Sequence, residues 1–277
     1  MLELAFIKRV TRTDESHEVK NNLIKNFQTV IDKIESELSG SVRTEDERSK
    51  LQKLLARGYH ELGVALQNQD QFFAANSYLE KAIGIRRLSE NPEVAYSIFL
   101  QFMNATRAYR AKKIKAIDEF MPGWENSLSF ELQQNAYLFR EASEPENFST
   151  TLHNLAYFHQ FLATERENEG LFVEAHKEYQ QAHQIYRNAK KIRERLRDPR
   201  RIAQSNVRIA ECKLGLGRYA LSRGALRTVC EFVDEASKLA EEVEKHYEEI
   251  PQEKFRMDDL ESIRKNIEQL KRDAHCI

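Results

Sequence analysis

The sequence predicts an all-α protein built from antiparallel helix hairpins. Apolar residues recur at helical spacing along most of the 277 residues. The chain has only five prolines and nine glycines, too few for an all-β protein with many turns. No run of alternating β-branched residues is long enough to be read as a strand. We therefore expect about ten helices, joined by short connections that place successive helices antiparallel.

Prolines mark several of the expected helix starts. Asn91-Pro92 and Asp198-Pro199 each place a capping side chain before a proline at the first helical position. Glu144-Pro145 and Ile250-Pro251 are expected to begin helices as well. The predicted helices span 15–39, 45–69, 71–89, 92–119, 126–142, 147–168, 170–197, 200–221, 225–248 and 253–274.

The segment 120–128, FMPGWENSL, is the clearest break in the helical pattern. Pro122 and Gly123 end one helix, and Trp124 is expected to cover the end of the core there. A bend between two halves of the chain is expected at this segment. The predicted organisation is an N-terminal helical segment over 1–45, a helical repeat region over 46–250 and a C-terminal capping helix over 251–277.

An internal repeat links two stretches that are offset by 100 residues. The stretch from Tyr59 to Ile85 places small residues among large apolar ones, and Asn68-Gln69-Asp70 interrupts its helical period. The same pattern returns between His159 and Tyr186, where Gly170 takes the place of Asp70. The matching small residues are Gly63, Ala75 and Ala82 in the first stretch and Ala163, Ala175 and Ala182 in the second. Each stretch is therefore expected to form two helices joined by a turn.

A second internal repeat, offset by 108 residues, pairs Leu88 with Leu196 and Ser97 with Ser205. Together the two internal repeats resemble the tetratricopeptide repeat (TPR), a helix-turn-helix unit of about 34 residues. In that family three small residues allow the paired helices to approach closely and to receive the next repeat. The six small residues named above match those places.

The resemblance covers two units well and a third unit, around Ile209-Ala210 and Ala236, less well. It does not extend over 1–45 or 92–146. It implies a right-handed solenoid of stacked hairpins, in which the helix over 253–274 covers the end of the core.

Motifs that would indicate an enzyme are missing from the sequence. Glycine-rich phosphate loops (GxxxxGK[ST], GxGxxG), HExxH and GxSxG do not occur. His176 and His183 share a helix face, but no carboxylate or cysteine is in step with them, so no metal and no cofactor are expected. Arg12 and His17 have the Arg-x4-His spacing of some helical ribonucleases, and this remains the less favoured alternative.

The cysteines and the lengths of the apolar segments indicate in which cellular compartment the protein is expected. Cys212, Cys230 and Cys276 are odd in number and far apart, which predicts a reducing compartment without a disulfide. Cys212 and Cys230 are expected to pack as small hydrophobic residues. The opening MLELAFIKRV is too short an apolar run for a signal peptide, and no run of about 18 apolar residues exists. A cytoplasmic location is therefore expected.

A net charge of −1 conceals a strongly uneven distribution. Between Arg187 and Arg227, thirteen basic residues face three acidic ones, whereas 231–253 carries a net charge of −7. The two segments could simply attract each other as neighbouring helices. Alternatively, the basic segment is a docking face for an acidic protein segment or for the phosphates of a nucleic acid, although aromatic residues for base stacking are sparse. The predicted docking face comprises Arg193, Arg195, Arg197, Arg200, Arg201 and Arg208.

The TPR resemblance also implies a concave groove lined by the first helix of each hairpin. In the first unit its positions correspond to Arg57, His60, Val64, Gln67 and Asn68. In the second they correspond to Tyr157, Gln160, Thr164, Glu167 and Asn168, and in the third to Gln204, Val207, Glu211 and Leu214. This mixed polar and apolar lining suits an extended peptide or a partner helix. The predicted function is a protein-interaction scaffold, adaptor or regulatory sensor, for which self-association is a further outcome.

Overall fold

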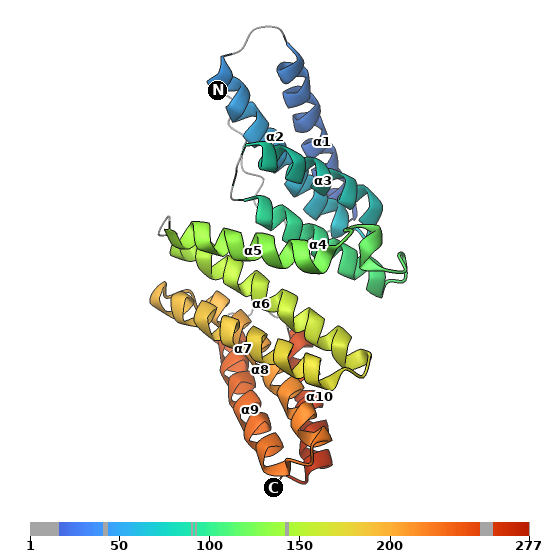
Figure 1. The fold of residues 1–277 in the computed structure, drawn as a ribbon. Coiled ribbons are helices and arrows are strands. Elements are labelled where there is room, and N and C mark those ends of the chain that lie inside the picture. Colours follow the sequence, from blue (N-terminus) through green and yellow to red (C-terminus); the bar gives the residue numbers. More distant parts are fainter. Residues whose placement is uncertain are drawn as a thin grey trace. The chain divides into compact units, whose positions relative to one another are not determined.

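The computed structural model describes residues 17–40, 44–89, 91, 93–141, 144–249 and 257–276. Within these residues the chain forms ten α-helices and one 3₁₀ turn, with no strand (Figure 1). This confirms the prediction of an all-α fold. The chain divides into two compact units, Met1–Leu128 (unit 1) and Ser129–Ile277 (unit 2), and the boundary falls within α5.

In unit 1 each of the first four helices packs against the next. Besides these sequential contacts, α2 also touches α4, as expected when hairpins stack. The elements of unit 1 are α1 (His17–Ser39), α2 (Glu45–Gln67), α3 (Phe72–Leu88), α4 (Val94–Arg110), the 3₁₀ turn η1 (Ile117–Glu119) and the first residues of α5 (Trp124–Glu141).

Unit 2 repeats this arrangement. Helices α6 to α10 pack in chain order, and the alternate pairs α6 with α8 and α8 with α10 also touch. Figure 1 shows α6 and α7 as an antiparallel pair, so the start of α6 and the end of α7 lie on the same side. After the end of α5, the elements are α6 (Pro145–Asn168), α7 (Phe172–Arg195), α8 (Pro199–Ser222), α9 (Leu226–Glu249) and α10 (Met257–Ala274).

Small residues lie at the close contacts inside the hairpins, as the repeat pattern predicted. A Cβ atom added at Gly63 of α2 would lie 2.8 Å from Cγ and Cδ2 of Leu79 on α3, which leaves no room for a side chain. The five alanines of the pattern are all buried: Ala75, Ala82, Ala163, Ala175 and Ala182. Small residues therefore set the distance between the paired helices.

The two hairpin turns end their first helices in the same way. Asp70 has φ 57°, and the Gln71 amide donates to the carbonyl of Leu66 at 3.0 Å. One hundred residues later Gly170 has φ 78°, and the Leu171 amide donates to the carbonyl of Arg166 at 2.8 Å. Both are Schellman motifs, in which one residue in the left-handed region reverses the chain. The sequence repeat thus includes the turn.

The predicted helix over 92–119 is shorter in the structure. Helix α4 ends at Arg110, and only the 3₁₀ turn η1 follows before α5. Lys112 has φ 56°, and the Lys113 amide donates to the carbonyl of Ala108 at 2.9 Å. A Schellman motif therefore ends the helix without a glycine or proline, which is why the sequence pattern did not reveal it.

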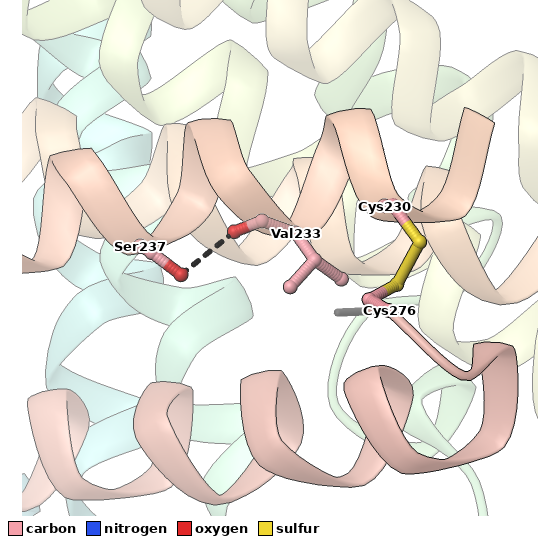
Figure 2. The surroundings of a disulfide bond; sticks show 4 residues. All are labelled: Cys230, Val233, Ser237 and Cys276. Carbon is pink, nitrogen blue, oxygen red and sulfur yellow. Dashed lines mark hydrogen bonds between the residues drawn. A yellow bond between two sulfur atoms is a disulfide. The ribbon is translucent and has the colours of Figure 1, made fainter. Parts of the chain in front are cut away.

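A disulfide joins Cys230 to Cys276, so the expectation of no disulfide is wrong. The two residues are 46 positions apart in sequence, but their Cα atoms are 5.5 Å apart. Helix α10 packs along α9 and also against α8, which brings the end of α10 back to the start of α9 (Figure 2). Cys212 is a free, buried thiol, in keeping with its expected packing role.

Candidate partner-binding surfaces

The predicted groove residues of unit 1 differ in their accessibility. Arg57 and Asn68 are exposed, and His60 and Val64 are half-buried on α2. Gln67 is only 3% exposed and corrects the prediction. It follows Gly63 by one helical turn, on the face of α2 that packs against α3.

The predicted groove residues of unit 2 lie in a network of hydrogen bonds within the unit. Gln160 donates to Glu211 of α8 at 2.7 Å and accepts from the hydroxyl of Tyr186 of α7 at 3.0 Å. Thr164 lies 3.4 Å from the hydroxyl of Tyr179. Tyr157 has the Arg208 guanidinium over its ring at 5.5 Å. This face of α6 is therefore engaged with α7 and α8, and a partner would have to displace these bonds.

Glu167 and Arg218 form a bidentate ion pair within this network. Arg218 donates from Nε to Oε1 of Glu167 at 2.6 Å and from Nη2 to Oε2 at 2.8 Å, and the Tyr179 hydroxyl donates to the same carboxylate. Burial by itself raises the pKa of the Glu167 carboxyl, but the donors Arg218 and Tyr179 outweigh burial and hold that pKa below its ordinary value. Glu167 is thus an anchor between α6 and α8. Asn168, next to it, is exposed.

The third predicted groove set is largely buried. Val207 is 4% and Leu214 2% exposed, and both belong to the core that α8 forms with α9 and α10. Glu211 accepts two hydrogen bonds from Arg208 at 3.0 and 2.8 Å. Gln204 is half-buried. Val207 and Leu214 are seven residues apart and therefore share the apolar face of α8, which corrects their assignment to a groove.

Arg193, expected on the docking face, is 2% exposed and corrects that prediction. Its Nη1 donates to the Ser205 hydroxyl at 2.8 Å and to the carbonyl of Arg201 at 3.0 Å, and it lies 3.1 Å from Nδ1 of His153. Burial, together with the nearby Arg201, lowers the pKa of Arg193 to about 10, although Asp198 and Tyr186 act in the opposite direction. The side chain stays charged at neutral pH and joins α6, α7 and α8.

Unit 1 contains the same cluster. Arg86 is 4% exposed, and its Nη1 donates to the Ser97 hydroxyl at 2.6 Å and to the carbonyl of Glu93 at 3.0 Å. The same Nη1 lies 3.4 Å from Nδ1 of His60. Each unit thus joins the second helix of its hairpin to the next helix through a buried arginine, a serine and a histidine. The sequence repeat paired Ser97 with Ser205, the serines of the two clusters. It did not indicate that Arg86 and Arg193 are their buried partners.

The remaining residues of the predicted docking face divide into two groups. Arg201 lies 3.2 Å from Glu146 and 3.4 Å from Asp198, and Arg208 is held by Glu211. Arg195, Arg197 and Arg200 are exposed at the α7–α8 turn.

The basic segment also pairs with the acidic helix α9. Lys213 lies 2.6 Å from Glu235, and Lys190 lies 3.9 Å from Glu242. Part of the segment therefore neutralises its neighbour, as the simpler of the two sequence interpretations expected. Of the predicted docking face, Arg195 and Arg197 at the α7–α8 turn are the exposed arginines that have no acidic side chain within ion-pair distance among the described residues.

The other candidate sites of the sequence have no described counterpart. In the part of the chain that the structure describes, no three His, Cys, Asp or Glu side chains are grouped so that they could hold a metal ion. His176 stacks on Tyr219 at 4.1 Å between ring centroids. Arg12 and the side chain of His17 lie outside the described residues. None of the described helices is both long enough and apolar enough to cross a membrane.

No protein-family model matches the chain, and no curated protein matches it at a significant level. Among solved structures, the chain is similar to a putative kinesin light chain of Podosopora anserina with nearly identical TPR-like repeats, at 18% identity over 80% of this chain and 92% of that one, with a TM-score of 0.40. A circular tandem repeat protein with a novel repeat topology matches at 13% identity, 92% and 64% coverage and a TM-score of 0.37. A computationally designed self-assembling cyclic homooligomer matches at 13% identity, 93% and 96% coverage and a TM-score of 0.26.

These similarities are distant. Within this chain, helices α1 to α4 and α6 to α10 pack in chain order, with small residues at the hairpin contacts and Schellman turns within the hairpins. Within each unit the described helices form TPR-like hairpins.

Proposed function

We propose that this chain is a protein-interaction scaffold that binds an acidic segment of a partner protein at the α7–α8 turn. The proposal rests on the exposure of the arginines at this turn and on the lack, in the described part of the chain, of acidic side chains beside two of them. Arg195 and Arg197 are exposed, and among the described residues neither has an acidic side chain within ion-pair distance. Arg200 is exposed beside them.

An acidic protein segment fits this surface chemically. The guanidinium group is planar and donates in parallel to both oxygens of a carboxylate. Because the whole chain carries a net charge of only −1, the attraction would be local to this turn. Most other arginines of the predicted face already bind acidic side chains of the same unit and could take a partner only by exchange.

A nucleic acid is the second candidate, and the aromatic residues of the region make it less favoured. Single-stranded nucleic acids are usually held by exposed aromatic rings on which bases stack. Tyr186 is fully buried, and Tyr219 stacks on His176. Tyr186 is therefore not available as a stacking platform, and Tyr219 already has one stacking partner, so phosphate contacts would have to supply most of the affinity.

A cross-linked pull-down from host lysate tests the proposal. The baits are the wild type and the triple variant Arg195→Glu/Arg197→Glu/Arg200→Glu, each with and without nuclease. Arg193 is left unchanged because its buried side chain joins three helices. A matched control, Lys112→Glu/Lys113→Glu/Lys115→Glu, makes the same change of charge at exposed positions of unit 1.

We expect partner proteins to be retained by the wild type and by the control, lost from the arginine variant and indifferent to nuclease. Recovery that depends on intact nucleic acid would favour the second candidate. The same proteins on all three baits would reject the α7–α8 turn and leave the exposed part of the α2 groove, around Arg57, as the surface to test.

A further inference from the structure

A cavity of about 390 Å³ lies in unit 2 beside the exposed arginines, between the end of α5, the start of α6 and the end of α7. We propose that this cavity holds an apolar side chain of the acidic segment that binds at the α7–α8 turn. The inference rests on the proposed function and adds to it the kind of sequence that the partner must carry, namely a phenylalanine or leucine flanked by carboxylates.

The chain path explains why three helix ends meet at this cavity. The antiparallel packing of α6 and α7 returns the end of α7 to the start of α6 (Figure 1). At the α5–α6 connection the Glu144 amide donates to the carbonyl of Phe139 at 3.0 Å, and this bond holds the end of α5 next to the start of α6. The walls of the cavity are therefore set by helix ends that are themselves fixed by backbone bonds and packing.

The lining is apolar inside and reaches solvent at its edge. Phe139 and Ile192 are 3% and 7% exposed, whereas Leu196 is 38% exposed. Pro145 and Phe148 of α6 complete the apolar lining. Cavities that bind small molecules usually measure about 300–1,000 Å³, so this one is at the small end and suits one or two side chains. An apolar anchor in a pocket of this kind commonly dominates the affinity of a protein interface.

The charges at the cavity decide which partner it fits. Arg140 and Arg195 both line it, are exposed and, among the described residues, have no acidic partner. Glu144 also lines it, and one of its carboxylate oxygens accepts from the Asn147 side chain at 2.5 Å. Two arginines outweigh this single carboxylate, and Arg197 and Arg200 extend the positive surface from Arg195. An apolar residue between carboxylates complements both the cavity and its edge.

Defined peptides test this inference without knowledge of the natural partner. The first probe is a fluorescein-labelled peptide of three glutamates, one phenylalanine and three glutamates. The second has serine in place of phenylalanine. Fluorescence anisotropy at low salt measures the binding of each to the full chain. We expect the phenylalanine peptide to bind about tenfold more tightly, because its ring leaves water for the apolar lining whereas serine has little apolar surface to bury.

Two tryptophan variants separate the cavity from the rest of the surface. Leu196→Trp places a larger side chain at the edge of the cavity and should remove the preference for phenylalanine. Leu88→Trp is the matched control. Leu88 matches Leu196 in the internal repeat that is offset by 108 residues, ends α3 in unit 1 and is 89% exposed. It should keep the full preference. Phe148→Ser, which removes an apolar wall, is the second cavity variant, and circular dichroism establishes that each variant is folded.

The outcomes distinguish this inference from the proposed function. Equal affinities of the wild type for the two peptides would overturn the cavity proposal, and if both peptides still lost affinity in Arg195→Glu/Arg197→Glu/Arg200→Glu, docking of acidic segments would stand. A preference for phenylalanine that persists in both Leu196→Trp and Phe148→Ser would also overturn it. Binding of neither peptide would count against both proposals.

Discussion

At the scale of single residues, His183 makes the stability of unit 2 dependent on pH. Burial lowers its pKa to about 4 from an ordinary value of 6.5, and the cations Lys213 and Arg187 act in the same direction, while Glu235 opposes them. Between pH 6.5 and 4 the unfolded chain therefore binds a proton that the folded chain does not. The stability contributed by neutral His183 is complete above pH 6.5 and is lost as the pH falls through this range.

We expect the urea midpoint of the wild type to fall between pH 7 and pH 5, and part of this fall to disappear in His183→Gln. The variant keeps a polar side chain of similar length but cannot bind the proton. Urea titrations of both proteins at pH 8, 7, 6 and 5 make the comparison, and the slope between pH 8 and 7 is the internal control. Identical slopes between pH 7 and 5 would remove His183 as the cause.

The buried Arg193 and the exposed Arg195 are a matched pair for separating structural from surface arginines. Arg193→Met leaves the Ser205 hydroxyl and the Arg201 carbonyl without their buried donor, which should lower the free energy of unfolding by about 1–3 kcal/mol. Arg195→Met should change it by no more than about 0.5 kcal/mol. Urea unfolding at pH 7.5 measures both. Equal stability of the two variants would show that the buried cluster does not hold α7 to α8.

At the scale of helices, two glycines test how closely the helices must approach. A Cβ atom at Gly215 of α8 would lie 2.5–2.7 Å from three ring carbons of Tyr179 on α7, whereas a Cβ atom at Gly84 of α3 has open space. The Tyr179 ring cannot move away easily, because its hydroxyl is bonded to Glu167 and Arg218. The α7–α8 contact therefore depends on the absence of a side chain at Gly215.

We expect Gly215→Ala to lower the free energy of unfolding by about 1–3 kcal/mol, because the added methyl group overpacks this contact. Gly84→Ala should raise it by about 0.5–1 kcal/mol, because alanine favours a helix more than glycine does. Urea or thermal unfolding distinguishes the two opposite signs. A neutral Gly215→Ala would mean that α8 can shift relative to α7 without cost.

The disulfide closes the hairpin of α9 and α10 at one end. Because it joins residues 46 positions apart, it restricts the unfolded chain, and the chain-entropy model gives a stabilisation of about 4 kcal/mol for a loop of this length. We expect dithiothreitol to lower the urea midpoint of the wild type. The variant Cys230→Ser/Cys276→Ser should start at the lower midpoint and show no response to the reductant. A wild type that is equally stable with and without reductant would contradict the prediction.

At the scale of the whole molecule, each unit is organised around its own core. The buried cluster around Tyr59 and Leu62 is built from α1, α2 and α3, all in unit 1. Two further clusters, around Tyr186 and Val233, are built from helices of unit 2. The segment 187–227 has a net charge of +10 and the segment 231–253 a net charge of −7. Both segments belong to unit 2, where α8 and α9 pack together. The near-zero net charge of the chain therefore conceals opposite charges that lie on neighbouring helices of one unit.

The sequence alone was sufficient for features that depend on neighbours along the chain. Helical periodicity located the ten helices, and the repeated small residues located the close hairpin contacts at Gly63 and its counterpart Ala163. These features are readable because a helix places residues three and four positions apart on one face, so a local pattern reports a local surface. The end of α4 at Arg110 was missed because the left-handed residue of its Schellman motif is Lys112 and not a glycine.

Only the tertiary structure decided which side chains are accessible. Phe72 and Phe172 occupy equivalent positions in the sequence repeat, yet one is 4% exposed and the other 47%. Arg193 and Arg195 are near neighbours in sequence, but one is buried and the other lies at the edge of a cavity. The pairing of Cys230 with Cys276 belongs to the same class. In each case the outcome depends on which helix ends meet, and those contacts join residues too far apart in the chain for a local pattern to encode them.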